Sequence, residues 1–192
     1  MTETDTPRPT DAPAYSRVAF QGALGAFSHE ACLALRPWDK PIPHATFAEA
    51  LEALTTGQCD MALIPIENST IGPVEPAATL VRESGLKVLA DVWRPIRHAL
   101  MGINGARMAD LRTVESHPIA LAQCAGTLKA MPLKIIEHFD TAGAARDVAE
   151  AGDPTRAAIA PVGAAEVYGL SILRNDLQDS SDNQTRFLLL SA

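Results

Sequence analysis

The sequence predicts an α/β protein. Short apolar runs of the kind that form buried strands alternate with stretches of helical periodicity along most of the chain. Such alternation favours sheets whose strands are largely parallel, with helices packed against them. The segment 87–97 is long for one strand and ends in polar residues, which indicates that the chain crosses there from one lobe to another.

The first expected strand, 17–20, runs into a loop with two glycines, 21–28. Ser28 can cap a helix predicted from His29 to about Leu35. A glycine loop that leads into a helix N-terminus presents free N–H groups, which suit a carboxylate or a phosphate. Many α/β proteins use such glycines only for a tight turn, and the spacing matches neither a P-loop nor a dinucleotide fingerprint. The loop alone therefore leaves both interpretations open.

Thr46 and Glu49 have the spacing of a capping box, which predicts a helix that ends near Gly57. The apolar run 61–66 follows as a strand covered on both faces, and Pro65 is expected to end its pairing.

Three polar residues follow at the carboxyl end of that strand: Glu67, Asn68 and Ser69. Ligands bind at this edge of open α/β sheets, so a carboxylate, an amide and a hydroxyl there suggest a functional site. A turn stabilised by Asn and Ser side chains explains the same residues equally well. A further helix is expected over 74–84.

The second unit begins with a strand over 111–115 and a helix from about 119 to 130. Pro118 fits the first helical turn, and Ser116 or His117 fits the cap. The remaining expected elements are a strand over 133–139, a helix capped by Asp140 or Thr141 and closed by Gly152, a strand over 157–160 and a helix from Pro161 to Gly169.

The end of the chain combines polar and apolar residues in a way that suggests a site. A polar run, 175–184, stops at Thr185 and Arg186 and turns into the apolar run 187–190, which predicts a buried final strand. Thr185 is therefore expected at the mouth of a strand, where it is placed for recognition or proton transfer. The alternative is that these residues only cap a neighbouring turn.

The composition limits the possible partners. Sixteen basic residues against 23 acidic ones give a net charge of −7, and 5% of the residues are aromatic, which argues against a nucleic-acid surface. No apolar run approaches the roughly 20 residues that span a bilayer, and the N-terminus lacks the pattern of a secretory signal. We therefore expect a cytoplasmic protein without nucleic-acid or membrane partners.

No metal site or disulfide is expected. Three cysteines lie far apart and form no Cys-x-x-Cys pair. The five histidines lack metal-ligand spacing and are interpreted as caps or surface residues. Residues 1–16, rich in Thr, Pro and acidic residues, are predicted to be a disordered tail. The cysteines are Cys32, Cys59 and Cys124, and the histidines are His29, His44, His98, His117 and His138.

Four blocks of this sequence resemble the prephenate dehydratase family in identity and in order, over about residues 17–192. At Ile119 the sequence departs from the Gln that members commonly carry, which removes one polar contact while Gln123 remains. The blocks are Phe20-Gln21-Gly22 with Gly25-Ala26-Phe27-Ser28, Pro65-Ile66-Glu67-Asn68-Ser69 with Gly72, Ser116-His117-Pro118 with Gln123-Cys124, and Asp140-Thr141-Ala142 followed by Asn183-x-Thr185-Arg186-Phe187.

The resemblance implies two α/β lobes similar to type 2 periplasmic binding proteins, with the active site in the cleft between them. The first lobe would contain residues 17–93 and 170–192, and the second lobe residues 94–169. The implied reaction is the decarboxylating dehydration of prephenate to phenylpyruvate in phenylalanine biosynthesis, without a cofactor or metal. A homodimer is also implied. The match covers the catalytic domain, without the ACT regulatory domain into which many relatives continue.

The resemblance also implies catalytic roles. Thr185 would donate a hydrogen bond or a proton to the departing hydroxyl, and Glu67 would be its acidic partner if the cleft raised the pKa of the carboxyl group. Gln123, Asn68 and Ser116 would be neutral hydrogen-bonding groups. Neutral donors suit the carboxylate that leaves, because a tight ion pair there would stabilise the ground state.

The remaining implied roles concern substrate binding. Thr141 would hold the pyruvyl carboxylate together with the loop formed by Gly25, Ala26, Phe27 and Ser28. Phe187 would form an apolar wall against the ring. Arg186 could bind a carboxylate, and an intramolecular salt bridge is the alternative for an arginine beside a strand.

Two rival functions remain open from the sequence. Arogenate dehydratase performs the same chemistry on a substrate with an aminated side chain. A non-catalytic module could use the same cleft to bind an aromatic acid.

Overall fold

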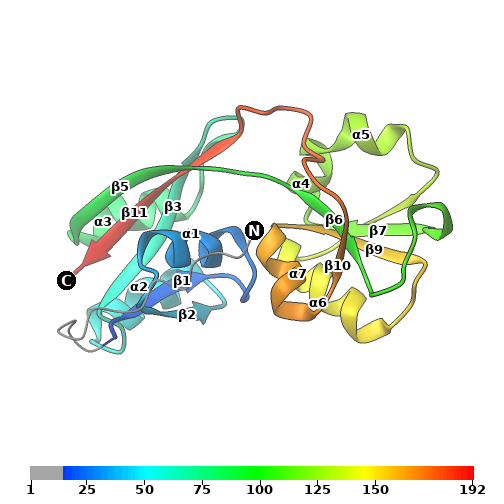
Figure 1. Cartoon of the computed structure of the whole chain (residues 1–192). Helices are drawn as coiled ribbons and strands as arrows, with labels where there is room; N and C mark the ends of the chain where they lie inside the picture. Colours follow the sequence, from blue (N-terminus) through cyan, green and yellow to red (C-terminus); the bar gives the residue numbers. More distant parts are fainter. Residues whose placement is uncertain (1–14) are drawn as a thin grey trace.

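The computed structural model describes residues 15–192, which form two lobes, each built on its own sheet (Figure 1). Of the predicted tail, 1–16, only Tyr15 and Ser16 lie within the described residues. The first sheet has the order β2-β1-β3-β11-β5, with β4 paired to β3. The elements of this lobe are β1 (Arg17–Gln21), α1 (Phe27–Leu35), β2 (Lys40–His44), α2 (Phe47–Thr55), β3 (Met61–Asn68), β4 (Gly72–Pro73), α3 (Ala77–Ser84), β5 (Lys87–Pro95) and β11 (Gln184–Ser191).

The second sheet has the order β10-β6-β9-β7-β8. Because β10 pairs with β6, the expected placement of residues 170–192 in the first lobe is wrong for β10, and only β11 returns to the first sheet. The elements of this lobe are β6 (Ala99–Gly102), the 3-10 helix η1 (Met108–Asp110), β7 (Thr113–Ser116), α4 (Pro118–Gln123), α5 (Ala125–Lys129), β8 (Lys134–Glu137), α6 (Thr141–Ala151), β9 (Arg156–Ala160), α7 (Val162–Tyr168) and β10 (Ser171–Arg174).

The expectation of largely parallel sheets is wrong. The strands β1, β2 and β3 pair in parallel, as do β7, β8 and β9. In contrast, β11 runs antiparallel to both β3 and β5, β6 runs antiparallel to β9, and β10 runs antiparallel to β6. Apart from the two-residue strand β4, which runs antiparallel to β3, the antiparallel strands flank the two passages of the chain between the lobes. A strand that reaches its sheet from the other lobe needs no helical crossover, so it is free to run antiparallel.

Pro65 does not end the pairing of β3. The strand continues to Asn68, and Pro65 lies opposite Phe187 of β11 at a point where the register shifts. A proline cannot donate a ladder hydrogen bond, and an irregularity of the pairing accommodates it. As a result β3 and β11 stay paired up to Asn68 and Thr185.

Most helix boundaries follow the local sequence signals. Thr46 and Glu49 form both hydrogen bonds of a capping box, and Gly152 ends α6 in the left-handed region at φ 63°. The predicted cap of α1 is wrong: the helix begins two residues earlier, and its N-cap is Ala26, whose side chain cannot accept a hydrogen bond. The helix expected over 119–130 is divided at Cys124 into α4 and α5.

Apolar side chains cover both faces of each sheet. On one face of the first sheet, Phe20, Leu63 and Phe187 pack beneath α1, and on the other face Ile64 and Leu190 pack against α2 and α3. The second sheet places one apolar cluster toward α6 and α7 and another toward α4 and α5. The two cores confirm the prediction of an α/β fold with two lobes.

The two passages between the lobes are bonded to each other. The Ile96 N–H donates to the Asn183 carbonyl at 2.8 Å, and the Leu177 N–H donates to the His98 carbonyl at 2.9 Å. No helix among residues 15–192 is long and apolar enough to cross a membrane. Cys32, Cys59 and Cys124 are buried free thiols.

Candidate active site

A cavity of about 410 Å³ lies between the two lobes. The first lobe lines it with the loop before α1 and with the adjoining ends of β3 and β11. The second lobe lines it with α4 and with the residues at the start of α6. His98, in the passage from β5 to β6, completes the wall. The cavity therefore lies in the expected position, in the interlobe cleft.

Thr185 and Asn68 form the centre of the wall from the first lobe. They are register partners on β11 and β3, and they are 8% and 5% exposed. Asn68 Nδ2 lies 2.9 Å from Thr185 Oγ1, and it also donates to Asn183 Oδ1 at 2.8 Å. Side-chain neighbours at a strand end thus become one hydrogen-bonded unit.

The orientation of the Asn68 amide is fixed by its oxygen. Asn68 Oδ1 accepts the backbone N–H groups of Thr70 at 3.0 Å and Ile71 at 3.2 Å. Because these groups can only donate, the NH₂ end must face Thr185, and Thr185 Oγ1 must accept. Among the described residues no acceptor takes the Thr185 hydroxyl proton, so this hydroxyl can donate to a ligand in the cavity.

A second amide, Gln123 at the end of α4, is oriented by His98. His98 Nε2 lies 2.8 Å from Gln123 Oε1, and His98 is 2% exposed. Burial lowers the pKa of His98, and the hydrogen bond to Gln123 opposes that shift. A neutral imidazole that carries its proton on Nε2 donates to Oε1, which leaves the Gln123 NH₂ group for the cavity. Phe27 packs edge-on against the imidazole, with ring centroids 5.2 Å apart.

The loop before α1 supplies backbone donors. Ala26, Phe27 and Ser28 line the cavity, and α1 begins there without a side-chain cap. The Ala26 N–H donates to the Ala23 carbonyl at 3.1 Å, so the donors at this helix end are those of Phe27 and Ser28. The first N–H groups of a helix lack intrahelical partners, so this helix end can bind a carboxylate.

Gly25 does not line the cavity. Its N–H donates to His29 Nδ1 at 3.0 Å, and a Cβ on Gly25 would lie 2.7 Å from Ala164 Cα on α7. The backbone at Gly25 has φ +84°, a value that also favours glycine. Gly25 is therefore a contact point between the lobes, in place of the substrate contact expected for it.

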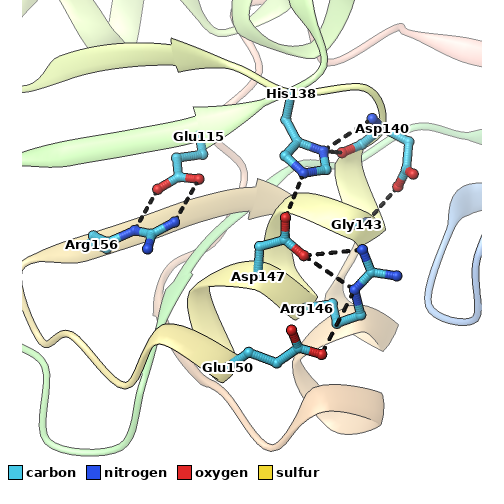
Figure 2. A network of polar contacts seen from close by, with 8 residues as sticks. All are labelled: Glu115, His138, Asp140, Gly143, Arg146, Asp147, Glu150 and Arg156. Atoms are coloured by element: carbon cyan, nitrogen blue, oxygen red, sulfur yellow. Dashed lines mark hydrogen bonds and ion pairs between the residues drawn. The ribbon is translucent and has the colours of Figure 1, made fainter.

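The start of α6 forms the opposite wall, with Phe139, Asp140 and Thr141. Asp140 caps the helix by accepting the Gly143 N–H. His138 lies behind this turn, with Nδ1 2.9 Å from the Asp140 carbonyl and Nε2 2.9 Å from Asp147 Oδ2 (Figure 2). The hydrogen bond from His138 is the main reason why the pKa of Asp147 is lowered.

Two further ion-pair contacts lie near this turn, and only the first shares a residue with the contacts of His138. Asp147 Oδ1 pairs with Arg146 at 3.0 Å, and Arg156 makes a two-pronged ion pair with Glu115 at 2.7 and 3.0 Å (Figure 2). Arg156 and Glu115 join neighbouring strands β9 and β7.

Glu67 and Arg186 lie outside the cavity, so Glu67 is not placed there as the expected acidic partner of Thr185, and Arg186 is not placed there to bind a carboxylate. Side chains alternate along a strand, so these neighbours of Asn68 and Thr185 face the other side of the sheet. Arg186 pairs with Asp91 at 2.6 Å and with Glu67 at 3.3 Å, and the hydrogen bond that it donates to Asp91 is the main cause of its raised pKa. Of the two roles expected for Arg186, binding a carboxylate or forming an intramolecular salt bridge, the structure shows the salt bridge.

Ser116 also contradicts its expected role. It is fully buried, and its hydroxyl donates to the Ile159 carbonyl at 2.6 Å, which ties β7 to β9. Gln123, Thr141 and Phe187 do line the cavity. Ile119 lines it as well, so the residue that departs from the family pattern presents an apolar side chain to the cleft.

One polar residue at the site was missed from the sequence, and the position of another was only partly anticipated. His98 was interpreted as a cap or a surface residue, yet it is buried against Gln123. Its position directly before the buried strand β6 was the available signal. Asn183 is 2% exposed, accepts from Asn68, and its Nδ2 has no hydrogen-bond partner in the described part of the chain. The sequence had marked this amide for recognition; the structure places it behind Asn68, outside the lining of the cavity.

Comparison with known proteins gives consistent matches. The sequence profile of a family described as prephenate dehydratase matches residues 18–192. A bifunctional N-acyl-homoserine lactone acylase/prephenate dehydratase of Komagataeibacter europaeus is 39% identical over 174 residues, covering 91% of this chain and 62% of the relative. Arogenate dehydratase 2 of Petunia hybrida is 41% identical over 175 residues, covering 91% of this chain and 44% of the relative.

The fold also matches a solved structure. The prephenate dehydratase of Arthrobacter aurescens in complex with L-Phe superposes with a TM-score of 0.80 at 32% identity, covering 91% of this chain and 60% of that one. The chain thus spans less than two thirds of the length of each of these three relatives.

Proposed function

The chain belongs to the prephenate dehydratase family, and from that premise we propose that it converts prephenate to phenylpyruvate, water and carbon dioxide in phenylalanine biosynthesis. The observation that carries the proposal is the Thr185 hydroxyl, which Asn68 fixes as an acceptor and leaves free to donate into the cavity. The enzyme would act as a carbon–oxygen lyase.

The reaction needs a proton donor at the leaving hydroxyl. Loss of carbon dioxide sends an electron pair into the ring, the ring becomes aromatic, and the C–O bond to the hydroxyl breaks. One proton completes the departing water. Thr185 would hydrogen-bond to the departing oxygen, and the transferred proton would be replaced from solvent. Groups placed in this way typically contribute about 10²- to 10⁴-fold in rate.

The neutral character of the wall supports the decarboxylation. Among the described residues that line the cavity there is no Lys or Arg, while Asn68 and Gln123 supply amide groups. A cation against the leaving carboxylate would stabilise the substrate more than the transition state, in which that charge moves into the ring. Gln123, oriented by His98, would donate to the ring carboxylate or to the hydroxyl.

The rest of the substrate would lie along the two remaining walls. The N–H groups at the start of α1, with Ser28 and Thr141, would bind the pyruvyl carboxylate. Phe187 and Ile119 would pack against the ring, because their apolar side chains line the cavity.

The direct test is turnover. Purified protein is incubated at neutral pH with prephenate and, in parallel, with arogenate, and phenylpyruvate and phenylalanine are followed against a sample without enzyme. Formation of phenylpyruvate above the uncatalysed rate is expected. A folded sample that turns over neither substrate would refute the proposal and favour a binding module.

The similarity to the K. europaeus relative suggests a third substrate for the same assay. An N-acyl-homoserine lactone tests the acylase activity named for that protein. A homodimer and a cytoplasmic location are further parts of the proposal; light scattering and cell fractionation test them.

A further inference from the structure

Asp140 is the only Asp or Glu among the described residues that line the cavity, and no Lys or Arg accompanies it there. Prephenate would bring two carboxylates into this cleft, in a chain whose net charge is already −7. A carboxylate on the wall repels such a ligand and attracts a ligand that carries a cation nearby. The charge of the wall is therefore informative about the side chain of the substrate.

One oxygen of the Asp140 carboxylate has no hydrogen-bond partner among the described residues. Oδ1 accepts the Gly143 N–H as the cap of α6, whereas Oδ2 has no hydrogen bond within residues 15–192. A Cβ at Gly143 would lie 2.8 Å from Oδ2, so the glycine leaves room for this oxygen. Through its backbone, Asp140 is also held by His138, which Asp147 holds in turn (Figure 2). The acceptor is thus fixed before any ligand binds.

The two walls offer complementary groups. The first lobe presents the uncapped start of α1 at Ala26, Phe27 and Ser28, which suits a carboxylate. The second lobe presents the Asp140 carboxylate, which suits an ammonium group. An α-amino acid carries both groups on one carbon, whereas an α-keto acid offers only a carbonyl oxygen in place of the ammonium, and a carboxylate cannot donate to it.

We propose that Asp140 binds the ammonium group of arogenate, so that this site accepts the α-amino substrate as well as prephenate. The inference rests on the proposed dehydratase function and adds a specificity-determining residue to it. Asp140 takes no part in the chemistry of the ring; it selects the group at the far end of the side chain.

The test compares kcat/KM for arogenate and for prephenate in the wild type and in Asp140→Asn. Asparagine caps a helix as well as aspartate does, so the variant removes the charge and keeps the cap. We expect kcat/KM for arogenate to fall by about tenfold or more, as for the loss of a charged hydrogen bond. The value for prephenate should stay within about threefold or rise, because a like charge has been removed.

Glu150→Gln is the matched control, since it removes a carboxylate from the same helix. The Glu150 side chain is 72% exposed and does not line the cavity. Its ratio of the two kcat/KM values should stay within about twofold of the wild type, because exposed charges interact weakly. Asp140→Ser retains a capping oxygen and serves if the Asn variant does not fold. Calorimetry adds a measurement without turnover: the charge-free variant should bind phenylalanine more weakly and phenylpyruvate no more weakly.

The outcomes separate the two proposals. A wild type that turns over neither substrate refutes the dehydratase function. A wild type that turns over prephenate but not arogenate overturns the role of Asp140 alone. The role of Asp140 is also overturned if Asp140→Asn and Asp140→Ser leave the ratio of kcat/KM for arogenate to kcat/KM for prephenate unchanged. An equal fall in both kcat/KM values has the same meaning.

Discussion

The two faces of β11 carry opposite chemistry one residue apart. Toward the cavity, Thr185 is buried and accepts a hydrogen bond from the neutral amide of Asn68. Toward the other side, Arg186 forms a partly exposed ion-pair cluster with Asp91 and Glu67. The difference shows that the polar residues of one short motif serve two tasks. Position along the strand, rather than chemical type, decides which residue meets the ligand.

The cavity face is expected to carry almost all of the activity. Thr185→Ala should lower kcat/KM for prephenate by about 10²- to 10⁴-fold, because it removes the donor to the leaving hydroxyl. Steady-state kinetics measures the loss, and Thr185→Ser should recover part of it. Phenylpyruvate binding should persist in the Ala variant. Nearly full activity in Thr185→Ala would remove this residue from the mechanism.

Asn68→Asp should have the next largest effect. A carboxylate cannot donate to Thr185 Oγ1, so the Thr185 hydroxyl would turn to donate to it instead of to the substrate. We expect a loss of about 100-fold in kcat/KM, in the lower part of the range for proton-transfer groups. Thermal unfolding should also show destabilisation of about 1–3 kcal/mol, since Asn183 Oδ1 loses one of its two donors and the Gln184 carbonyl loses the Asn68 amide. Wild-type kinetics in this variant would contradict the proposed orientation.

His98 gives the cavity face a pH dependence near neutrality, whereas Asp91 on the ion-pair face, whose pKa is lowered from 3.8 by the hydrogen bond with Arg186, changes charge only in acid. The pKa of His98 in the folded protein is lowered from 6.5 by burial, so below pH 6.5 the unfolded chain binds more protons. The stabilisation from the neutral imidazole is complete above pH 6.5 and is lost as the pH falls toward the lowered pKa. Urea unfolding at pH 8 and pH 5.5 should show a smaller pH effect in His98→Gln. Equal pH effects in both proteins would show that His98 is not held neutral.

The ion-pair face should respond least. Glu67→Gln should change kcat/KM by less than about threefold and the free energy of unfolding by about 1 kcal/mol at most, because partly exposed ion pairs contribute little. Asp91→Asn is the control, since it weakens the same cluster from β5. If Glu67→Gln lowered kcat/KM about 100-fold and Asp91→Asn did not, Glu67 would be the acid that assists Thr185, and the two faces would not differ in function as described.

Local signals in the sequence determined much of this protein. Apolar runs and helix caps predicted most strands and helices, because periodicity and capping are decided by nearby residues. The Asn-x-Thr-Arg-Phe motif placed Thr185 at a strand end, and Asn68 and Gln123 were recognised as polar groups of the site. The short strands β2, β4, β6 and β10 were missed; β2 contains two prolines, which are unusual in strands.

Only the tertiary structure decided which of those polar residues share the cavity. Whether Asn68 or Glu67 faces inward depends on the pairing of β3 with β11, two strands more than 100 residues apart in the chain. The burial of His98 against Gln123 and the placement of Asp140 opposite α1 depend on how the two lobes meet. The sequence alone predicts the elements and their chemistry, because these follow from local geometry. The partners of each side chain follow from long-range packing, which no local pattern encodes.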